Sequence, residues 1–364
     1  MHIEIYSRMG HSITPPLRII SWNLTIRCPL KCPHCYSDAG TRDVSDPLST
    51  TEAFDILDQI KATGNPVVIL SGGEPMMRED IFEIARYGTG LGLKMAMGTS
   101  GYLFDEKTIQ NLKKSGISSV AFSIDSADPV VHDSFRGSPG AWNRAVNAIR
   151  SCVGEGIGVQ INMTIIKPDP VELDLVVALG KELGVHTYQI FIPVPTGRSM
   201  QENYERYGTY EELLKYIIRR YADDPISLRP TCIPQFRRVA EELGVTHPRW
   251  GRGCLAGITY CRIYANGDVT PCPYLPAIAG NLRETPLSEL WAGSEVFQAL
   301  RDYNRLQGKC GICEYKTICG GCRARAFSEY GTMVQSCGSL VRPKDIEGEL
   351  CAEDPLCPYQ PKRG

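Results

Sequence analysis

Between residues 18 and 222, short segments rich in β-branched residues alternate with amphipathic segments, and this alternation limits the fold more than any other feature. Nearly continuous apolar strands separated by helices indicate a parallel sheet covered by helices, which right-handed crossovers curl into a barrel. We predict an α/β fold with a partial (β/α)6 barrel, since six units fall short of the eight that close a full barrel. The predicted strand segments are 18–25, 66–75, 94–100, 119–126, 158–166 and 187–194, and the predicted helices are 49–64, 79–90, 105–115, 141–154, 171–183 and 210–221.

The composition of the chain changes after residues 223–230. Proline, glycine and cysteine become dense there, and the sequence NGD at 266–268 predicts a hairpin turn. A chain of 364 residues suggests about two domains. We therefore divide it into an N-terminal extension (1–17), the barrel (18–222) and a small cysteine-rich domain (223–364) that needs metal to hold it together.

Charge and hydropathy exclude several classes of protein. The net charge is −2 and the sequence pI is near 6.3, so we expect no nucleic-acid partner. No segment approaches the roughly 18 apolar residues that a membrane span requires, and the first residues lack the apolar core of a secretory signal. We expect a cytoplasmic protein with reduced thiols and no membrane partner.

Fifteen cysteines are many for such a chain, and their positions are uneven. Eleven fall between Cys232 and Cys357, whereas Cys152 stands alone on the apolar stripe of a predicted helix and is expected to be a buried core residue. Reduced, clustered cysteines indicate metal binding rather than disulfides. We therefore expect metal centres at both ends of the chain.

The first cysteine group, Cys28, Cys32 and Cys35, has the spacing CxxxCxxC in a loop that follows the first predicted strand. Three thiolates in so compact a loop suit three irons of a 4Fe-4S cluster and leave the fourth iron free to bind a ligand. The loop lies at the carboxyl end of the sheet, where α/β folds place their active sites. SGGEP, at 71–75, ends the next strand.

These two motifs, CPLKCPHC and SGGEP, resemble those of the radical S-adenosylmethionine (radical SAM) enzymes. The resemblance implies a cluster on Cys28, Cys32 and Cys35 that cleaves SAM to a 5′-deoxyadenosyl radical, which abstracts hydrogen from the substrate. It also implies that His34 fills a position that is usually aromatic. The motif Gly72, Gly73, Glu74 and Pro75 would receive the SAM methionine, with the glycines allowing close approach and Glu74 receiving the ammonium group.

Polar residues at later strand ends are further SAM contacts by the same resemblance, although each is equally well read as a helix cap. They are Thr99 and Ser100, Ser123 and Asp125, and Asn162 and Thr164, with backbone at Ile192 and Val194 expected beside the adenine.

The C-terminal cysteines resemble the SPASM extension, a twitch-type domain that holds one or two auxiliary 4Fe-4S clusters. The resemblance implies a distal cluster on Cys310, Cys313, Cys319 and Cys357, and a proximal cluster on Cys254, Cys272 and Cys322 with Cys261 as a fourth ligand. One departure is that two residues, not three, separate Cys319 from Cys322, which puts the proximal set in doubt. The alternative is a zinc ribbon on Cys310, Cys313, Cys319 and Cys322. Cys232, Cys337 and Cys351 have no assigned role.

Several stretches, among them GDVTPCPYLPAIAGNLRE (267–284) and CGGCRARAF (319–327), resemble the tetrapyrrole-modifying branch of the family. The resemblance implies an enzyme of haem biosynthesis that removes two acetate side chains of 12,18-didecarboxysiroheme to give iron-coproporphyrin III. It implies an iron tetrapyrrole as substrate and a flavodoxin- or ferredoxin-type electron donor. Arginine suits the substrate carboxylates, and Arg198, Arg323 and Arg325 are the candidates, although surface arginines are the simpler reading of each.

Three alternatives stay open from the sequence. One is the decarboxylase that converts iron-coproporphyrin to haem. Another is a peptide or protein maturase of the SPASM type, although some 17 residues before the first strand leave no obvious place for a peptide-recognition domain. The last is a non-catalytic iron-sulfur or zinc scaffold.

Overall fold

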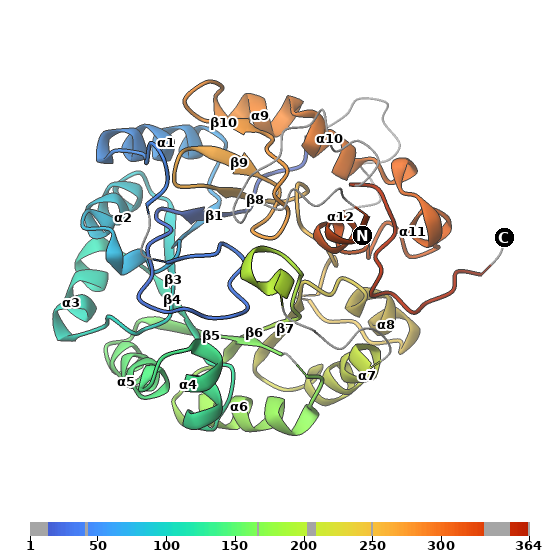
Figure 1. The fold of residues 1–364 in the computed structure, drawn as a ribbon, viewed down its shortest axis with the longest axis horizontal. Helices are drawn as coiled ribbons and strands as arrows, with labels where there is room; N and C mark the ends of the chain where they lie inside the picture. The colour runs from blue at the N-terminus through green and yellow to red at the C-terminus, as the bar shows by residue number, and fades with distance from the viewer. Residues whose placement is uncertain are drawn as a thin grey trace.

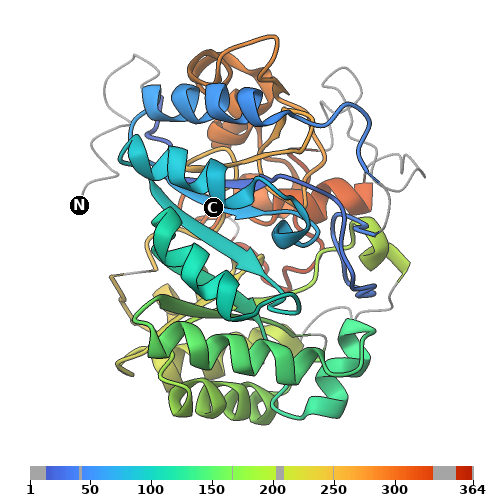
Figure 2. The ribbon, with the colours of Figure 1, turned by 90° about the vertical axis from the view of Figure 1, so that its left-hand side faces the viewer.

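The computed structural model describes residues 14–40, 43–165, 167–201, 209–248, 250–330 and 350–362. Its centre is a ten-stranded sheet in the order β10-β9-β8-β1-β2-β3-β4-β5-β6-β7. Helices surround the curved sheet in Figure 1, and Figure 2 shows α1 to α3 stacked along its outer side. The strands are β1 Ile19–Asn23, β2 Val67–Ser71, β3 Lys94–Thr99, β4 Ser119–Ser123, β5 Gly158–Thr164, β6 Thr187–Phe191, β7 Ser227–Thr231, β8 Tyr260–Ile263, β9 Asp268–Thr270 and β10 Gly280–Asn281.

The helices follow the strands as the sequence predicts, with the capping box of Ser49 and Glu52 present at the start of α1. The α-helices are α1 Thr50–Ala62, α2 Ile81–Gly90, α3 Glu106–Ser115, α4 Pro129–Arg136, α5 Ala141–Gly154, α6 Pro170–Glu182, α7 Thr209–Tyr221, α8 Phe236–Glu242, α9 Leu287–Gly293, α10 Glu295–Arg301, α11 Gly308–Ile312 and α12 Arg323–Tyr330; the 3-10 helices are η2 Pro75–Met77, η3 Gly197–Gln201 and η4 Tyr303–Arg305.

The six predicted βα units are confirmed, and the structure adds parallel strands at both sides of them. β7 pairs in parallel with β6, and β8 pairs in parallel with β1. Pro230 lies in β7, a position that an edge strand tolerates because proline donates no ladder hydrogen bond. The division of the chain at 222/223 stays a prediction, and the hydrogen-bonded sheet runs across it.

The two faces of the sheet differ in chemistry. On the outer face, residues such as Ile20, Trp22 and Phe122 join the main apolar core beneath the helices, as Cys152 does from α5. Successive strand residues point to opposite faces. The alternate residues therefore face inward, and many of them are small or polar: Ser21, Asn23, Ser71, Ser123, Asn162, Thr231, Tyr260 and Arg262. The strands are thus less continuously apolar than the sequence suggested, and their polar face positions the site.

Helix α4, residues 129–136, is an element that the sequence reading missed. It starts at Pro129 after Asp128, whose side chain accepts a hydrogen bond from the Val130 backbone, and this Asp-Pro pair is a helix-start signal that could have located it. The helix is short and two valines on it are exposed, so it lacks a clear apolar period. Its last turn contacts the first cysteine loop.

Candidate active site and cluster-binding cysteines

The first cysteine loop is closed at its base by backbone hydrogen bonds. The Cys28 N–H donates to the Gly40 carbonyl at 2.7 Å, and the Gly40 N–H donates to Ile26 at 2.9 Å. Backbone N–H groups also point at the sulfurs, from Leu30 to Cys28 and from Ala39 to Cys35, both at 3.4 Å. Such donors stabilise thiolates that bind iron, so the loop fits the cluster that its spacing predicts.

Cys32 is the most buried of the three thiols, at 7% exposure, and it contacts α4. Its sulfur lies 3.6 Å from the Arg136 carbonyl oxygen and 3.9 Å from Nη1 of the same residue. Arg136 in turn donates to Asp125 at 2.6 Å, and Asp125 accepts the Thr164 N–H at 3.0 Å. A buried ion pair therefore joins the end of β4 to the cysteine loop.

His34 stacks on Phe135 of α4, with ring centroids 4.0 Å apart and planes inclined by 11°. Burial lowers the pKa of His34 to about 3, so the imidazole is neutral at physiological pH. The side chain thus packs as a flat ring beside the cysteines and carries no charge there.

The SGGEP motif brings the end of β2 against the segment that leads into the cysteine loop. A Cβ on Gly72 would lie 2.4 Å from the Thr25 carbonyl oxygen, and one on Gly73 would lie 2.4 Å from that of Arg27. Sequence reasoning assigned these glycines to close approach of the ligand. In the structure, the glycines are required because the end of β2 packs directly against the backbone of Thr25 and Arg27.

Glu74 is completely buried, and its carboxylate accepts hydrogen bonds from the end of β3. The donors are the Thr99 hydroxyl at 2.7 Å, and the Ser100 N–H and hydroxyl at 2.9 and 2.5 Å. Burial raises the pKa of Glu74, and these donors oppose the rise. Glu74, Thr99 and Ser100 therefore form one hydrogen-bond network. This network joins the ends of β2 and β3 beside the first cysteine loop.

The remaining strand-end residues divide into two groups. Ser123 and Asn162 lie on the inner face and keep part of their surface exposed, as a ligand contact requires. Ile192 and Val194 are buried, Ile192 in the main core and Val194 in a second core beside the C-terminal cysteines. Pro75 is buried at the start of η2. The roles of all these residues toward SAM stay predictions.

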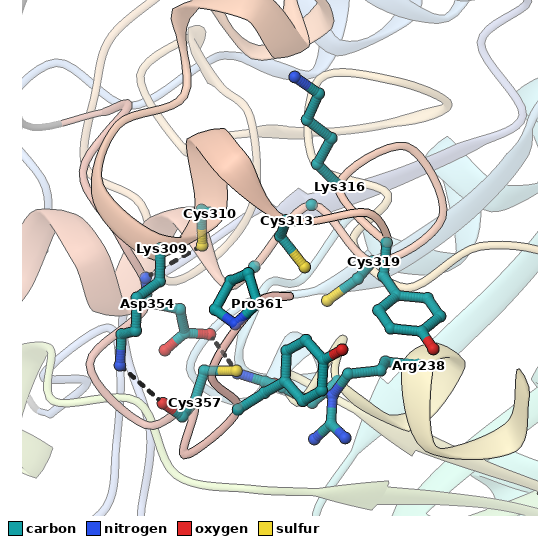
Figure 3. Close-up of a pocket in the computed structure, with 14 residues that line it drawn as sticks. Arg238, Lys309, Cys310, Cys313, Lys316, Cys319, Asp354, Cys357 and Pro361 are labelled. Atoms are coloured by element: carbon teal, nitrogen blue, oxygen red, sulfur yellow. Dashed lines mark hydrogen bonds between the residues drawn. The ribbon is translucent and has the colours of Figure 1, made fainter. Parts of the chain in front are cut away.

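Four C-terminal cysteines line one pocket: Cys310, Cys313, Cys319 and Cys357. Figure 3 shows their sulfur atoms facing a common space. The Cys310 sulfur accepts the Asp354 N–H at 3.4 Å and lies 3.5 Å from Arg323 Nη2. The donor set is that predicted for the distal cluster, whereas the zinc ribbon would require Cys322 in this pocket, and Cys322 is not among the residues that line it.

The two glycines of CGGC explain how Cys319 and Cys322 separate despite their short spacing. Gly320 and Gly321 have φ of +77° and +60°, a left-handed conformation that other residues rarely adopt. A Cβ on Gly321 would also lie 3.0 Å from the Cys310 sulfur. The chain therefore turns sharply, and Cys322 packs into the second core while Cys319 stays at the pocket.

Cys322 lies with Cys254, Cys272 and Cys232, a residue to which the sequence assigned no role. Cys232 and Cys272 pack against the second core that contains Cys322. Burial raises the pKa of the Cys232 thiol, and Cys322, Cys272 and Cys254 raise it further because like charges would face one another. Cys232 also has φ of +61°, a strained value for a non-glycine residue.

Cys261, the predicted fourth proximal ligand, lies elsewhere. It points from β8 into the main apolar core with no exposed surface, and burial raises its pKa to about 12, with Arg301 as the nearby charge. Among the described residues, no three His, Cys, Asp or Glu side chains could hold a metal ion between them. Cluster ligands lie farther apart than the ligands of one ion, because each thiolate binds its own iron.

The three candidate substrate arginines are engaged within the protein. Arg198 donates to the Cys32 carbonyl at 2.9 Å and to Asp38 at 2.9 Å, so it closes the cysteine loop. Arg323 donates to the Leu350 carbonyl at 3.3 Å. Arg325 pairs with Asp354 through two hydrogen bonds of 3.0 Å. The structure thus gives each a structural role, and their assignment to substrate stays untested.

The comparisons with known proteins agree with this geometry. The Radical SAM superfamily matches residues 22–177, and the SPASM iron-sulfur cluster-binding domain matches residues 254–323. The AdoMet-dependent heme synthase of Methanosarcina barkeri is 38% identical, over 96% of this chain and 99% of that protein. The chain belongs to the radical SAM enzymes with a SPASM domain.

Other relatives of this radical SAM enzyme are less similar. The Fe-coproporphyrin III synthase of M. barkeri is 28% identical over 93% of this chain and 87% of that protein, and the mycofactocin maturase MftC of Mycobacterium tuberculosis is 29% identical over 85% and 78%. Streptococcus suis SuiB bound to S-adenosylmethionine has the same fold, with a TM-score of 0.69 and 21% identity over 93% of this chain and 77% of that one.

These findings confirm several expectations. The family, the tetrapyrrole-modifying branch, the fold class and the enzymatic nature of the chain are as predicted. A radical SAM domain uses SAM and a 4Fe-4S cluster, and a SPASM domain carries additional iron-sulfur clusters, so the predicted cofactors are confirmed too. In the described residues, no helix combines the length and the apolar character that crossing a membrane takes.

Proposed function

We propose that this radical SAM enzyme catalyses the closing step of a haem pathway, the decarboxylation of iron-coproporphyrin to haem. The observation that carries the proposal is full-length similarity. Three AdoMet-dependent heme synthases are 35–38% identical over 96% of the chain, against 28% for the Fe-coproporphyrin III synthase. The similarity therefore favours the decarboxylase alternative over the acetate-removing reaction named first from the sequence, within the same pathway.

The reaction converts two propionate side chains to vinyl groups. Each propionate loses a hydrogen atom, carbon dioxide and one electron. One electron therefore enters for each SAM cleaved, and one leaves with each carbon dioxide and passes to an external one-electron acceptor. A cluster held by Cys28, Cys32 and Cys35 would, together with SAM, supply the radical chemistry that removes the hydrogen atom. A flavodoxin- or ferredoxin-type donor is the proposed source of the entering electron.

The residues of the chain hold the reacting groups in place. Cys28, Cys32 and Cys35 would hold the SAM-cleaving cluster, in a loop braced by Arg198 and by the Asp125–Arg136 pair. The Glu74 network fixes the strand ends where SAM is expected to bind. The polar inner face of the sheet lies next to this loop and offers hydrogen-bonding partners to a substrate with several carboxylates.

Anaerobic turnover followed by mass spectrometry tests the proposal. With reconstituted enzyme, SAM and reductant, iron-coproporphyrin III is expected to lose two carbon dioxide molecules and four hydrogens, while 12,18-didecarboxysiroheme stays unchanged. Conversion of didecarboxysiroheme alone would instead establish the acetate-removing reaction. No change in either tetrapyrrole, with SAM still cleaved, would leave a peptide or protein maturase.

We also propose a ligand set for the auxiliary clusters, with Cys310, Cys313, Cys319 and Cys357 for the distal one. For the proximal one it is Cys254, Cys272, Cys322 and Cys232, with Cys232 in place of Cys261. Cys232 packs with Cys272 and Cys322 and lies near enough to Cys254 for the two charges to interact, whereas Cys261 points into the main core.

Alanine variants of the two cysteines are expected to separate these assignments. Cys232→Ala should lower the iron bound per chain and change the electron paramagnetic resonance signal of the reduced auxiliary clusters, because one iron loses its thiolate. Cys261→Ala should keep both and lose only modest stability, since it removes one small buried side chain. Loss of iron in Cys261→Ala alone would restore the original assignment.

A further inference from the structure

Arg262 is a buried arginine outside the groups assigned above to the clusters and to SAM. It lies on β8 and is 3% exposed. Its neighbours in the strand, Cys261 and Ile263, point into the main core, so Arg262 points to the inner face, in register with Ser21 of β1. Within the described ranges, Nε and Nη2 of Arg262 are both buried and have no hydrogen-bond partner.

Aromatic side chains surround the guanidinium. Its central carbon lies 4.4 Å from the ring centre of Tyr264 and 5.8 Å from that of Tyr36. Tyr36 follows Cys35 directly, and its hydroxyl lies 3.2 Å from the Asn23 amide nitrogen on the inner face of β1. The Tyr36 ring is also 5.2 Å from Tyr274, two residues after Cys272. Arg262 therefore lies between the first cysteine loop and the proximal auxiliary cysteines.

Three tyrosine side chains near Arg262 keep some accessible surface. Tyr36, Tyr260 and Tyr274 each keep part of their surface accessible, although burial raises the pKa of all three. A ligand can therefore approach along these tyrosines, whose rings offer flat apolar surface. Arg262, which is 3% exposed, offers a positive charge behind them.

An unpaired guanidinium in such a place is costly, because burial of a charge is unfavourable unless hydrogen bonds and a counter-charge compensate. The free nitrogens define the ligand, since Nε and Nη2 form one edge of the planar fork that binds a carboxylate through two parallel hydrogen bonds. The cation–π contacts hold the plane in position, and the Nε and Nη2 edge makes no hydrogen bond in the described residues.

We propose that Arg262 binds a propionate carboxylate of the tetrapyrrole substrate and so sets the position of the macrocycle between the two cysteine groups. This inference rests on the proposed function. It assigns to Arg262 the role that sequence reasoning gave to Arg198, Arg323 and Arg325, which are engaged with other parts of the chain. Arg262 is a binding residue for substrate, and its guanidinium takes no part in the hydrogen abstraction.

Titration of the oxidised holoenzyme with iron-coproporphyrin III, followed by absorbance, tests the assignment without turnover. Arg262→Gln is expected to weaken binding at least about 30-fold, the loss that follows removal of one partner from a buried charge pair. The same variant, free of substrate, should unfold at a temperature equal to or above that of the wild type, because it removes an unpaired buried charge. A structural arginine would give the opposite shift.

Arg301→Gln is the matched control. Arg301 lies on α10 and is half-buried. Its Nη2 also lacks a hydrogen-bond partner in the described residues, but its Nε and Nη1 donate to the Gly257 and Trp291 carbonyls at 2.8 and 2.7 Å. Its replacement should lower stability and leave binding unchanged. The tetramethyl ester of iron-coproporphyrin III is the matched ligand, and Arg262→Gln should not weaken its binding because the ester carries no carboxylate.

The outcomes are distinguishable. If the wild type converts iron-coproporphyrin III and Arg262→Gln binds it equally well, the proposed function stands and the Arg262 assignment is rejected. A lower unfolding temperature with equal losses for acid and ester would also reject it, in favour of a structural role. If the wild type neither binds nor converts the substrate, the assignment is rejected together with the proposed function.

Discussion

Replacement of Asp354 by asparagine is expected to lower the free energy of unfolding by about 3–5 kcal/mol, the cost of breaking one buried ion pair from one side. Asp354 has no exposed surface. Its carboxylate accepts two hydrogen bonds from Arg325, one from Gln235 at 2.7 Å and one from the Cys322 N–H at 2.7 Å. The variant leaves Arg325 buried without its counter-charge.

Anaerobic denaturant unfolding of the holoenzyme measures this loss. The matched control is Glu353→Gln, one residue away, where a partly exposed carboxylate lies 3.8 Å from Lys309 Nζ. Its replacement should cost about 1 kcal/mol or less, because a long, partly exposed pair contributes little and the glutamine oxygen can still accept the Lys309 N–H. If both variants lost the same free energy of unfolding, the buried pair of Asp354 and Arg325 would contribute no more to stability than the partly exposed pair.

The loss should also depend on pH. Burial by itself would raise the pKa of Asp354, but the Arg325 guanidinium outweighs it and holds the pKa below the usual range. A depressed pKa contributes stability above the unfolded value of about 3.9 and loses it as the pH falls through the folded value. The stability difference between wild type and Asp354→Asn should therefore be constant near neutral pH and shrink below about pH 4.

Replacement of Cys32 by alanine is expected to abolish SAM cleavage and to remove the iron of one cluster from the reconstituted enzyme. Cys32 is the buried member of the three-cysteine loop, and its sulfur contacts Arg136. The three-cysteine spacing already leaves one iron of the first cluster without a protein ligand. Loss of the Cys32 thiolate would leave a second iron without one. Release of 5′-deoxyadenosine and iron content per chain are the two readouts.

Cys152→Ala is the control for this experiment. Cys152 is also buried, at 0% exposure against 7% for Cys32, and it packs from α5 into the main apolar core. Its replacement should keep full iron content and full SAM cleavage, at a modest cost in stability. If Cys32→Ala retained SAM cleavage, the assignment of CxxxCxxC to the reacting cluster would be rejected.

Local patterns were enough to predict the frame of the protein. Each predicted strand and helix from 18 to 222 is found within a few residues of its predicted bounds, because apolar periodicity and caps act over short distances. The hairpin at NGD is also found, between antiparallel β8 and β9. The cysteine spacings alone indicated both groups of candidate metal ligands, since a cluster imposes its size on the loop that binds it.

Other features depend on residues far apart in the chain. The burial of Glu74 against Ser100, the place of Cys232 beside Cys322, and the ion pair of Arg325 with Asp354 each join elements that no local pattern relates. The same holds for the arginines. Sequence reasoning chose Arg198 because it follows the sixth strand, and Arg323 and Arg325 because they lie beside cysteines. Only the packed structure shows which guanidinium groups have partners.

The sequence by itself therefore determined the fold class and the family. Apolar periodicity predicts the barrel, and the spacing of short cysteine motifs predicts a loop for the SAM-cleaving cluster and a second group of cysteines. The tertiary structure decided how these parts are combined. It placed Cys232 with the proximal thiols, turned Cys261 into the core and left Arg262 on the inner face with one edge of its fork unpaired. Burial and pairing are properties of the packed chain, and they are fixed only when distant segments meet.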